Sequence, residues 1–160
     1  MGRLMAIDYG DVRIGIAMTD PMQIIAGQSQ TLVNTPDTFA EIARMVKSES
    51  VESIVLGMPY SEQATVGFAA RKVVKFAIGL LETFSQNGID IPLYEQDEGY
   101  TTVSAYQSMS KMSIKKRKKK KQIVDQIAAT KILQEFMDTK KRMIFDIEKY
   151  KKLISNTEQK

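Results

Sequence analysis

The stretch from Leu4 to Asp20 constrains the fold most, because an apolar segment ends in an acid and turns directly into a second apolar segment. In an extended strand, side chains alternate between two sides, so Asp8 shares a side with Leu4 and Ala6. A carboxylate buried among apolar groups is costly unless a cation or hydrogen bonds compensate it. The stretch therefore predicts a hairpin that holds an acid at the end of a buried strand.

The second strand of this hairpin, Val12 to Met18, carries the small residues Gly15 and Ala17 on one side. Their size leaves room for a ligand beside Asp8. A simpler interpretation is a turn aspartate whose oxygen accepts hydrogen bonds from the backbone of residues 9–11. The hairpin alone leaves both interpretations open.

Strand and helix patterns alternate along the rest of the chain, which is typical of an α/β fold with crossover helices. In chain order, the patterns predict a strand at 24–33, a helix through 39–46 capped by Asp37 or Thr38, a buried strand at 53–56, a helix through 69–84, a strand at 91–94, a short helix at 101–109, a basic loop, a helix at 123–137 and a mostly exposed helix at 142–153. The first three strands should pair antiparallel and the later ones parallel. These elements together make a mixed five-stranded sheet flanked by helices.

The length of 160 residues fits one domain with a substantial core and is too short for two. We expect that domain at 1–139, followed by a lysine-rich helical extension at 140–160. No apolar run approaches ~20 residues and no apolar region follows the first residues, so neither a membrane span nor a signal peptide is expected. The expected location is a reducing cytoplasm.

The chain has no cysteine and no histidine. These absences exclude disulfides, thiol nucleophiles and thiolate metal sites, and they remove the commonest general base. Any catalysis must therefore rest on carboxylates, hydroxyls, lysines or hard metal ions. Sites built from oxygen ligands suit Mg²⁺ or Mn²⁺ better than zinc.

The net charge of +4 comes from one basic run. That run contains seven of the 23 basic residues and no acid: Lys115, Lys116, Arg117, Lys118, Lys119, Lys120 and Lys121. The other 16 basic residues face 19 acidic ones, which leaves the remainder at −3. Such a patch is typical of proteins that bind a phosphate backbone, although a solvated loop with no ligand is the alternative.

Asp125 lies in the apolar stripe of its own predicted helix. Helix positions three, four and seven residues later share its face, and these are Ala128, Ala129 and Ile132. A first-turn aspartate is also favoured by the helix dipole, which is the alternative explanation. A cap facing solvent would serve the dipole without desolvation, so the direction of Asp125 favours a ligand role.

Glu98 stands where a strand ends and a helix begins, which in open α/β sheets is a common place for a site. Alternatively, Thr101 or Thr102 caps the helix and Glu98 only complements its dipole. If Asp8, Glu98 and Asp125 converge within ~4 Å, they cannot all remain ionised without a cation. A pair of divalent ions ~3.5 to 4 Å apart would neutralise them and can hydrolyse a phosphodiester.

These residues resemble the YqgF family of RNase H-like proteins, which is related to the RuvC Holliday junction resolvases. The resemblance runs from about Leu4 to Met137. Four segments carry it: Asp8, Gly10, Arg13, Ile14, Gly15 and Ala17; then Gly57 and Pro59; then Asp97, Glu98, Thr101 and Thr102; and finally, after a lysine-rich loop, Val124, Asp125, Ala128 and Ala129.

The resemblance implies an RNase H-like fold and a cytoplasmic nuclease that matures the 5′ end of 16S ribosomal RNA. It implies that Asp8, Glu98 and Asp125 are the catalytic metal ligands, with two Mg²⁺ or Mn²⁺ ions. We expect Arg13, Thr101, Thr102 and the run from Lys115 to Lys121 to bind the nucleic acid. The expected partners are pre-rRNA, which we favour over branched DNA, and precursors of the small ribosomal subunit. We expect no membrane contact, and we expect the protein to be a monomer or a weak homodimer.

One departure from the family pattern is Gly99, which stands where relatives carry an arginine. It motivates one alternative, a nucleic-acid- or ribosome-binding protein without efficient chemistry. A second alternative is a DNA endonuclease like the Holliday junction resolvases. A third is an actin-like kinase, because the turn after Asp8 resembles a phosphate-binding turn, but that architecture needs two such domains.

Overall fold

The computed structural model describes residues 2–60, 67–98 and 114–158. In chain order, its elements are β1 (Arg3–Asp8), β2 (Arg13–Thr19), β3 (Ala26–Val33), α1 (Thr38–Ser48), β4 (Val51–Met58), α2 (Phe68–Gln86), β5 (Leu93–Asp97), α4 (Ile114–Asp138), β6 (Met143–Ile144) and α5 (Ile147–Glu158). Within these residues no helix is long and apolar enough to cross a membrane.

The strands form one mixed sheet in the order β3-β2-β1-β4-β5-β6. β1 pairs antiparallel with β2 and parallel with β4, and β4 pairs parallel with β5. The predicted antiparallel start and parallel continuation are confirmed. The sheet has one more strand than the five predicted, because the two-residue β6 adds antiparallel to β5. A strand of two residues leaves too short a pattern to recognise in a sequence.

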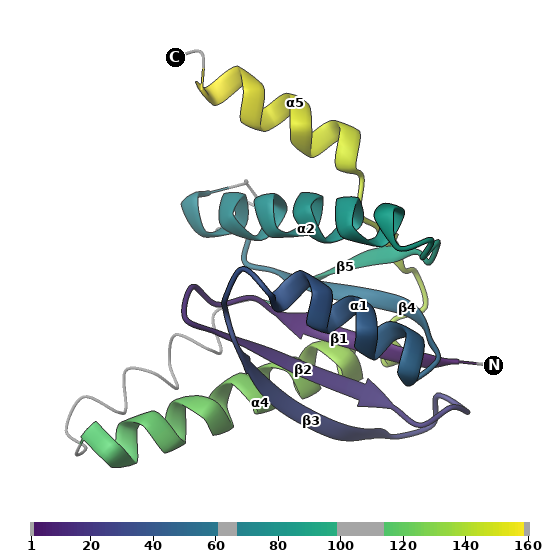
Figure 1. The fold of residues 1–160 in the computed structure, drawn as a ribbon, viewed down its shortest axis with the longest axis vertical. Coiled ribbons are helices and arrows are strands. Elements are labelled where there is room, and N and C mark those ends of the chain that lie inside the picture. The colour runs from purple at the N-terminus through teal and green to yellow at the C-terminus, as the bar shows by residue number, and fades with distance from the viewer. Residues whose placement is uncertain (1, 61–66, 99–113, 159–160) are drawn as a thin grey trace.

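Alternation along the strands divides the core between the two faces of the sheet. Met5 and Ile7 of β1 face α1 and α2 and belong to the larger apolar cluster. Leu4 and Ala6 face α4 and belong to the smaller one. Figure 1 shows α1 and α2 on one side of the sheet and α4 on the other. Asp8 continues the alternation on the α4 side, as its position in the sequence predicts.

Several element boundaries differ from the prediction; β4 begins at Val51 and not at residue 53, and α5 begins at Ile147 and not at residue 142, because β6 occupies residues 143–144. The run from Lys115 to Lys121 belongs to α4 and is not a loop, because lysine and arginine favour helices. β3 begins at Ala26 and not at Ile24, and β5 runs from Leu93 to Asp97, where residues 91–94 had been expected. The predicted short helix at 101–109 lies outside the described residues.

The C-terminal helix α5 is mostly exposed, as predicted, but one of its residues and the segment before it pack against the sheet. The N–H of Phe145 donates to the carbonyl of Leu93 at 2.9 Å, and the Phe145 ring stacks on Tyr150 with centroids 4.8 Å apart. Tyr150 is 1% exposed within the larger apolar cluster. The neighbouring lysines are exposed, so the sequence of this helix, which is rich in lysine, gives little sign that Tyr150 is buried. The division into a domain at 1–139 and an extension at 140–160 stays a prediction.

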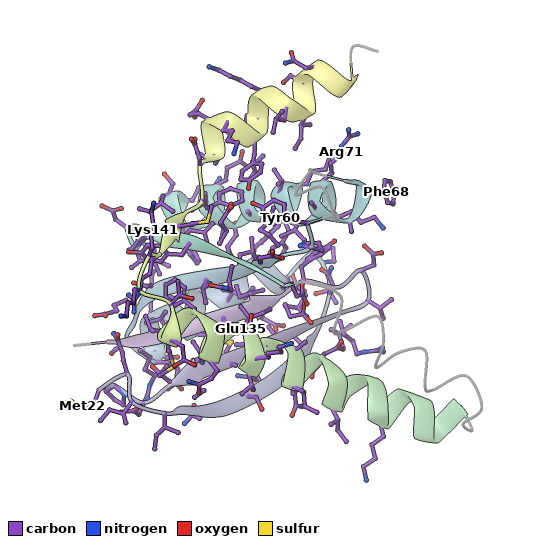
Figure 2. The ribbon with its side chains drawn as sticks, turned by 180° about the vertical axis from the view of Figure 1, so that it is seen from behind. Met22, Tyr60, Phe68, Arg71, Glu135 and Lys141 are labelled. Carbon is purple, nitrogen blue, oxygen red and sulfur yellow. The ribbon has the colours of Figure 1, made fainter. Side chains whose placement is uncertain are left out.

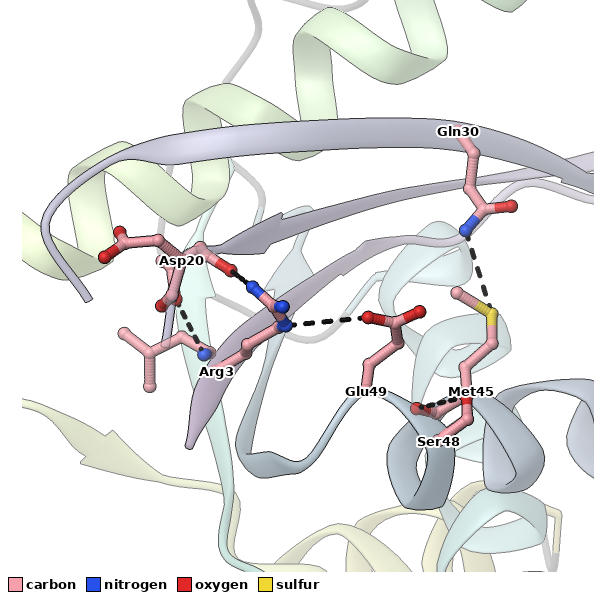
Figure 3. Close-up of polar contacts among 8 residues, drawn as sticks. Arg3, Asp20, Gln30, Met45, Ser48 and Glu49 are labelled. Carbon is pink, nitrogen blue, oxygen red and sulfur yellow. Dashed lines mark hydrogen bonds and ion pairs between the residues drawn. The ribbon is translucent and has the colours of Figure 1, made fainter. Parts of the chain in front are cut away.

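Polar contacts fasten the hairpin at the end opposite Asp8 (Figure 3). Arg3 donates to the carbonyl of Thr19 at 3.2 Å and lies 3.5 Å from the carboxylate of Glu49. The Asp20 carboxylate accepts hydrogen bonds from the N–H groups of Ile25, Ile24 and Met22, which lower its pKa. These contacts fix the turn between β2 and β3.

Candidate active site

The three acids come from three elements that meet at one edge of the sheet. Asp8 is the last residue of β1 and lies opposite Gly15 in the register with β2. Glu98 follows β5 directly, and its N–H donates to the carbonyl of Met58 at the end of β4, at 3.0 Å. Because β1, β4 and β5 are parallel, their carboxyl ends share this edge. Asp125 reaches the edge from α4.

Two glycines allow the acids to approach. A Cβ atom on Gly15 would lie 2.2 Å from the carbonyl oxygen of Asp125, so the bare backbone of β2 lets α4 come into contact. A Cβ atom on Gly57 of β4 would lie 3.2 Å from the Oε2 atom of Glu98 and 2.5 Å from Ile132. Both glycines lie on the α4 side of the sheet. They make the space in which the three carboxylates gather.

Burial and mutual repulsion set the charge of the site. Asp8 is 7% exposed and Asp125 is 6% exposed. Burial raises the pKa of Asp8 to about 10, helped by a hydrogen bond with Glu98 and by the negative charges of Glu98 and Asp125. Without a cation, burial therefore favours the protonated form of Asp8 at neutral pH. The structure thus brings together the three acids that the sequence singled out.

Arg13, at the start of β2, brings a positive charge to the site. Its Nε atom lies 3.3 Å from the Oδ2 atom of Asp125, and both side chains are largely buried. A guanidinium in this position compensates the buried carboxylate. The contact of Arg13 with a phosphate, expected from the sequence, stays a prediction.

The donor set fits a hard divalent cation. Carboxylate oxygens are the ligands that Mg²⁺ and Mn²⁺ prefer, and the proton held by Asp8 marks a place where positive charge is needed. Within 2–60, 67–98 and 114–158, no three acidic side chains already stand in metal-binding positions. In this arrangement Asp8 is hydrogen-bonded with Glu98, and Asp125 is paired with Arg13.

The remaining predicted nucleic-acid contacts are only partly described. Thr101 and Thr102 lie outside the described residues. The backbone from Lys115 to Lys121 forms the first turns of α4, and Lys119 is exposed. Figure 1 shows this part of α4 projecting beyond the sheet. The basic run therefore leads directly, along one helix, to Asp125.

The sequence analysis missed a buried polar cluster on the other face of the sheet, formed by Tyr60, Glu95 and Tyr150. Figure 2 shows Tyr60 at the level of α2, whereas Glu135 lies on α4 across the sheet. The sequence does contain one signal for this cluster: Glu95 lies two residues after Leu93, so the two side chains share the core-facing side of the strand. The predicted strand stopped at residue 94, and this acid was left outside it.

Comparison with known proteins gives one consistent result. Residues 2–139 match the family model described as "RuvX: Holliday junction resolvase". Among similar proteins, one from Acetivibrio thermocellus is 37% identical over 89% of this chain and 99% of its own length. One from Bacteroides fragilis is 38% identical over 88% of this chain and 99% of its own length. The names of both describe them as candidate pre-16S rRNA nucleases.

A solved structure shares the fold. Thermus thermophilus RuvC in complex with a Holliday junction substrate superposes with a TM-score of 0.55 at 12% sequence identity. The match covers 91% of this chain and 100% of that one. The likeness confirms the predicted RNase H-like fold class.

Proposed function

The chain belongs to the RuvX/YqgF family, and from this premise we propose that it is a metal-dependent nuclease acting in 5′-end maturation of 16S pre-rRNA. The observation that carries the proposal is the meeting of Asp8, Glu98 and Asp125 at one edge of the sheet, with a pKa of about 10 for Asp8. A divalent cation can neutralise such a cluster of carboxylates in place of the proton. The reaction is hydrolysis of a phosphodiester bond.

In this proposal, Asp8, Glu98 and Asp125 hold two Mg²⁺ or Mn²⁺ ions. Bound there, the ions would lower the pKa of a water molecule and neutralise charge on the phosphate. Asp8 would hold the ions in its deprotonated form, and Arg13, which pairs with Asp125 at 3.3 Å, would then be available to a phosphate of the substrate. The lysines of α4 hold the phosphate backbone beside the acids.

Pre-rRNA is the substrate we favour, because the relatives that align over nearly their whole length are named for it. The description of the family model favours a second candidate, branched DNA. A labelled precursor fragment of 16S rRNA and a labelled four-way DNA junction, each with Mg²⁺, Mn²⁺ or EDTA, separate the two. We expect metal-dependent cutting of the RNA. Binding of both without cutting of either would favour the non-catalytic alternative motivated by Gly99.

Exchange of Arg13 for Gln should make the protein more dependent on metal. Without metal, the variant loses the ion pair between residue 13 and Asp125, so its melting temperature should fall in EDTA. With saturating Mn²⁺ the melting temperature of the variant should recover, because the metal ion no longer competes with the Arg13 guanidinium for Asp125. The Mn²⁺-induced rise in melting temperature should exceed that of the wild type. Arg44→Gln on the exposed face of α1 is the control, and an equal rise in both variants would contradict the competition.

Removal of lysines from the basic run should weaken RNA binding. We compare a variant with Gln at residues 118–121 with one that has Gln at the exposed positions 140, 141, 151 and 152. Both lose four charges, and Gln keeps a helix intact. Each lost phosphate contact reduces the slope of log K against log salt by about 0.7 for single strands. Filter binding from 50 to 300 mM salt should show a flatter slope for the first variant. Equal slopes would rule out the basic run as the phosphate contact.

A further inference from the structure

A buried polar cluster on the face of the sheet opposite the three acids joins the end of β4, β5 and α5. The hydroxyls of Tyr60 and Tyr150 donate to the two oxygens of the Glu95 carboxylate, with a distance of 2.6 Å for Tyr150. The two phenol oxygens lie 2.5 Å apart. Glu95 is 5% exposed and Tyr150 is 1% exposed. A carboxylate is tolerated at this depth because each oxygen has a donor.

The two phenols remain protonated donors at every physiological pH. Burial and the neighbouring Glu95 carboxylate raise the pKa of Tyr60 to about 12. The same causes raise the pKa of Tyr150. The cluster is therefore a fixed connection between elements, and it does not switch with pH.

Backbone contacts connect this cluster to Glu98. The carbonyl of Met58 accepts hydrogen bonds from the N–H of Tyr60 and from the N–H of Glu98, both at 3.0 Å. Glu95 lies three residues before Glu98, at the same end of β5. The backbone of Glu98 is thus held from two directions, through Met58 by Tyr60 and along β5 by Glu95.

Tyr150 completes the cluster from a segment that the family match, residues 2–139, does not include. We propose that Tyr150 is a positioning residue, which fixes Glu95 and Tyr60 and thereby holds Glu98 in place for metal binding. The role in metal binding rests on the proposed function; the restraint on the Glu98 backbone does not. The C-terminal helix, although it lies across the sheet from the three acids, is in this way part of the support of the active site.

Tyr150→Phe removes one hydroxyl and keeps the buried ring. The Glu95 carboxylate then loses a donor, so the ends of β4 and β5 should open more often. Ile42→Val, in the core beside α1, is the control for a general loss of stability, because this change leaves the cluster intact. Both variants are made in the full chain.

The first measurement is amide hydrogen exchange by NMR without metal, with Ile7 of β1 as the reference for global unfolding. In Tyr150→Phe we expect the Glu98 amide to exchange at least about tenfold faster relative to Ile7, as loss of a hydrogen bond to a charged group implies. In Ile42→Val the ratio should not change. Equal acceleration of Glu98 and Ile7 in Tyr150→Phe would overturn the positioning role.

The second measurement is Mn²⁺ titration of RNA cleavage. Tyr150→Phe should raise the Mn²⁺ concentration for half-maximal rate and lower kcat, with KM for RNA unchanged, whereas Ile42→Val should change none of these. Unchanged kcat and Mn²⁺ dependence in Tyr150→Phe would contradict the proposal. If the wild type cuts no RNA, the proposed function fails, and the exchange ratio still decides whether Tyr150 restrains Glu98.

Discussion

Asp8→Asn is expected to reduce RNA cleavage by about 1,000-fold or more, since several kcal/mol of transition-state stabilisation depend on the bound metal. The same change should make the metal-free protein more stable. Asn is neutral at every pH and close in shape to the protonated aspartate, so it removes the cost of keeping Asp8 protonated without leaving a cavity. Loss of activity together with a gain in stability separates a role in catalysis from a role in folding.

The gain in stability should grow with pH. The folded protein holds a proton on Asp8 up to a pKa of about 10, whereas the unfolded chain releases it near 3.8. Between these values the unfolded state binds fewer protons, so the wild type loses stability as pH rises, by at most about 1.4 kcal/mol per pH unit. Asn at this position cannot lose a proton. The difference in melting temperature in EDTA should therefore widen between pH 5 and pH 9.

Thermal unfolding in EDTA and cleavage of the labelled precursor test this prediction on the same preparations. Asp90→Asn, at an exposed position in the loop before β5, is the matched control and should resemble the wild type in both assays. Retained cleavage by Asp8→Asn would remove Asp8 from the site. If Asp8→Asn lost as much stability between pH 5 and pH 9 as the wild type does, the raised pKa could not belong to Asp8.

Gly15→Ala should have the second largest effect, because it separates α4 from the sheet without touching an acid. The added Cβ would lie 2.2 Å from the carbonyl oxygen and 2.8 Å from the carbonyl carbon of Asp125. Both are backbone atoms, so the helix itself must shift. Overpacking of this kind costs about 1–3 kcal/mol, and the displaced Asp125 should also lower the rate of cleavage.

Gly27→Ala is the control for the change of residue type within the same sheet. Its Cβ would meet only the Cγ2 atom of Ile25, at an ordinary 3.9 Å. Urea unfolding and cleavage should place Gly27→Ala near the wild type and Gly15→Ala well below it. Equal stability and activity of the two variants would mean that α4 does not depend on the bare backbone of Gly15.

The sequence predicted the position of the acids because it combined two independent patterns. Asp8 shares the strand period with Leu4 and Ala6, and Asp125 shares the helix period with Ala129 and Ile132. An acid on the apolar face of a strand or helix can be recognised from the sequence when the boundaries of that element are predicted correctly. The same rule exposes Glu95 once the strand is extended, because β5 ends at Asp97, three residues beyond the predicted end.

Other features depend on contacts between distant segments, and a local pattern carries no signal for them. The phenol of Tyr150 is buried because β6 turns the chain back along β5, and β6 is only two residues long. The lysines of α5 made that helix resemble a solvated one. Residues 115–121 carry no apolar period, so the sequence predicts a loop there, whereas the high helix propensity of lysine lets α4 begin at Ile114. The catalytic and nucleic-acid roles of the predicted residues stay predictions.

The most direct test of a metal centre built on the three acids is a Mn²⁺ titration of the wild type and of Asp125→Asn. Electron paramagnetic resonance measures the free ion in each titration. We expect two Mn²⁺ ions on the wild type and a loss of at least one of them in the variant, with a folded chain in both. The same number of ions bound with the same affinity by both proteins would contradict a metal centre built on Asp8, Glu98 and Asp125.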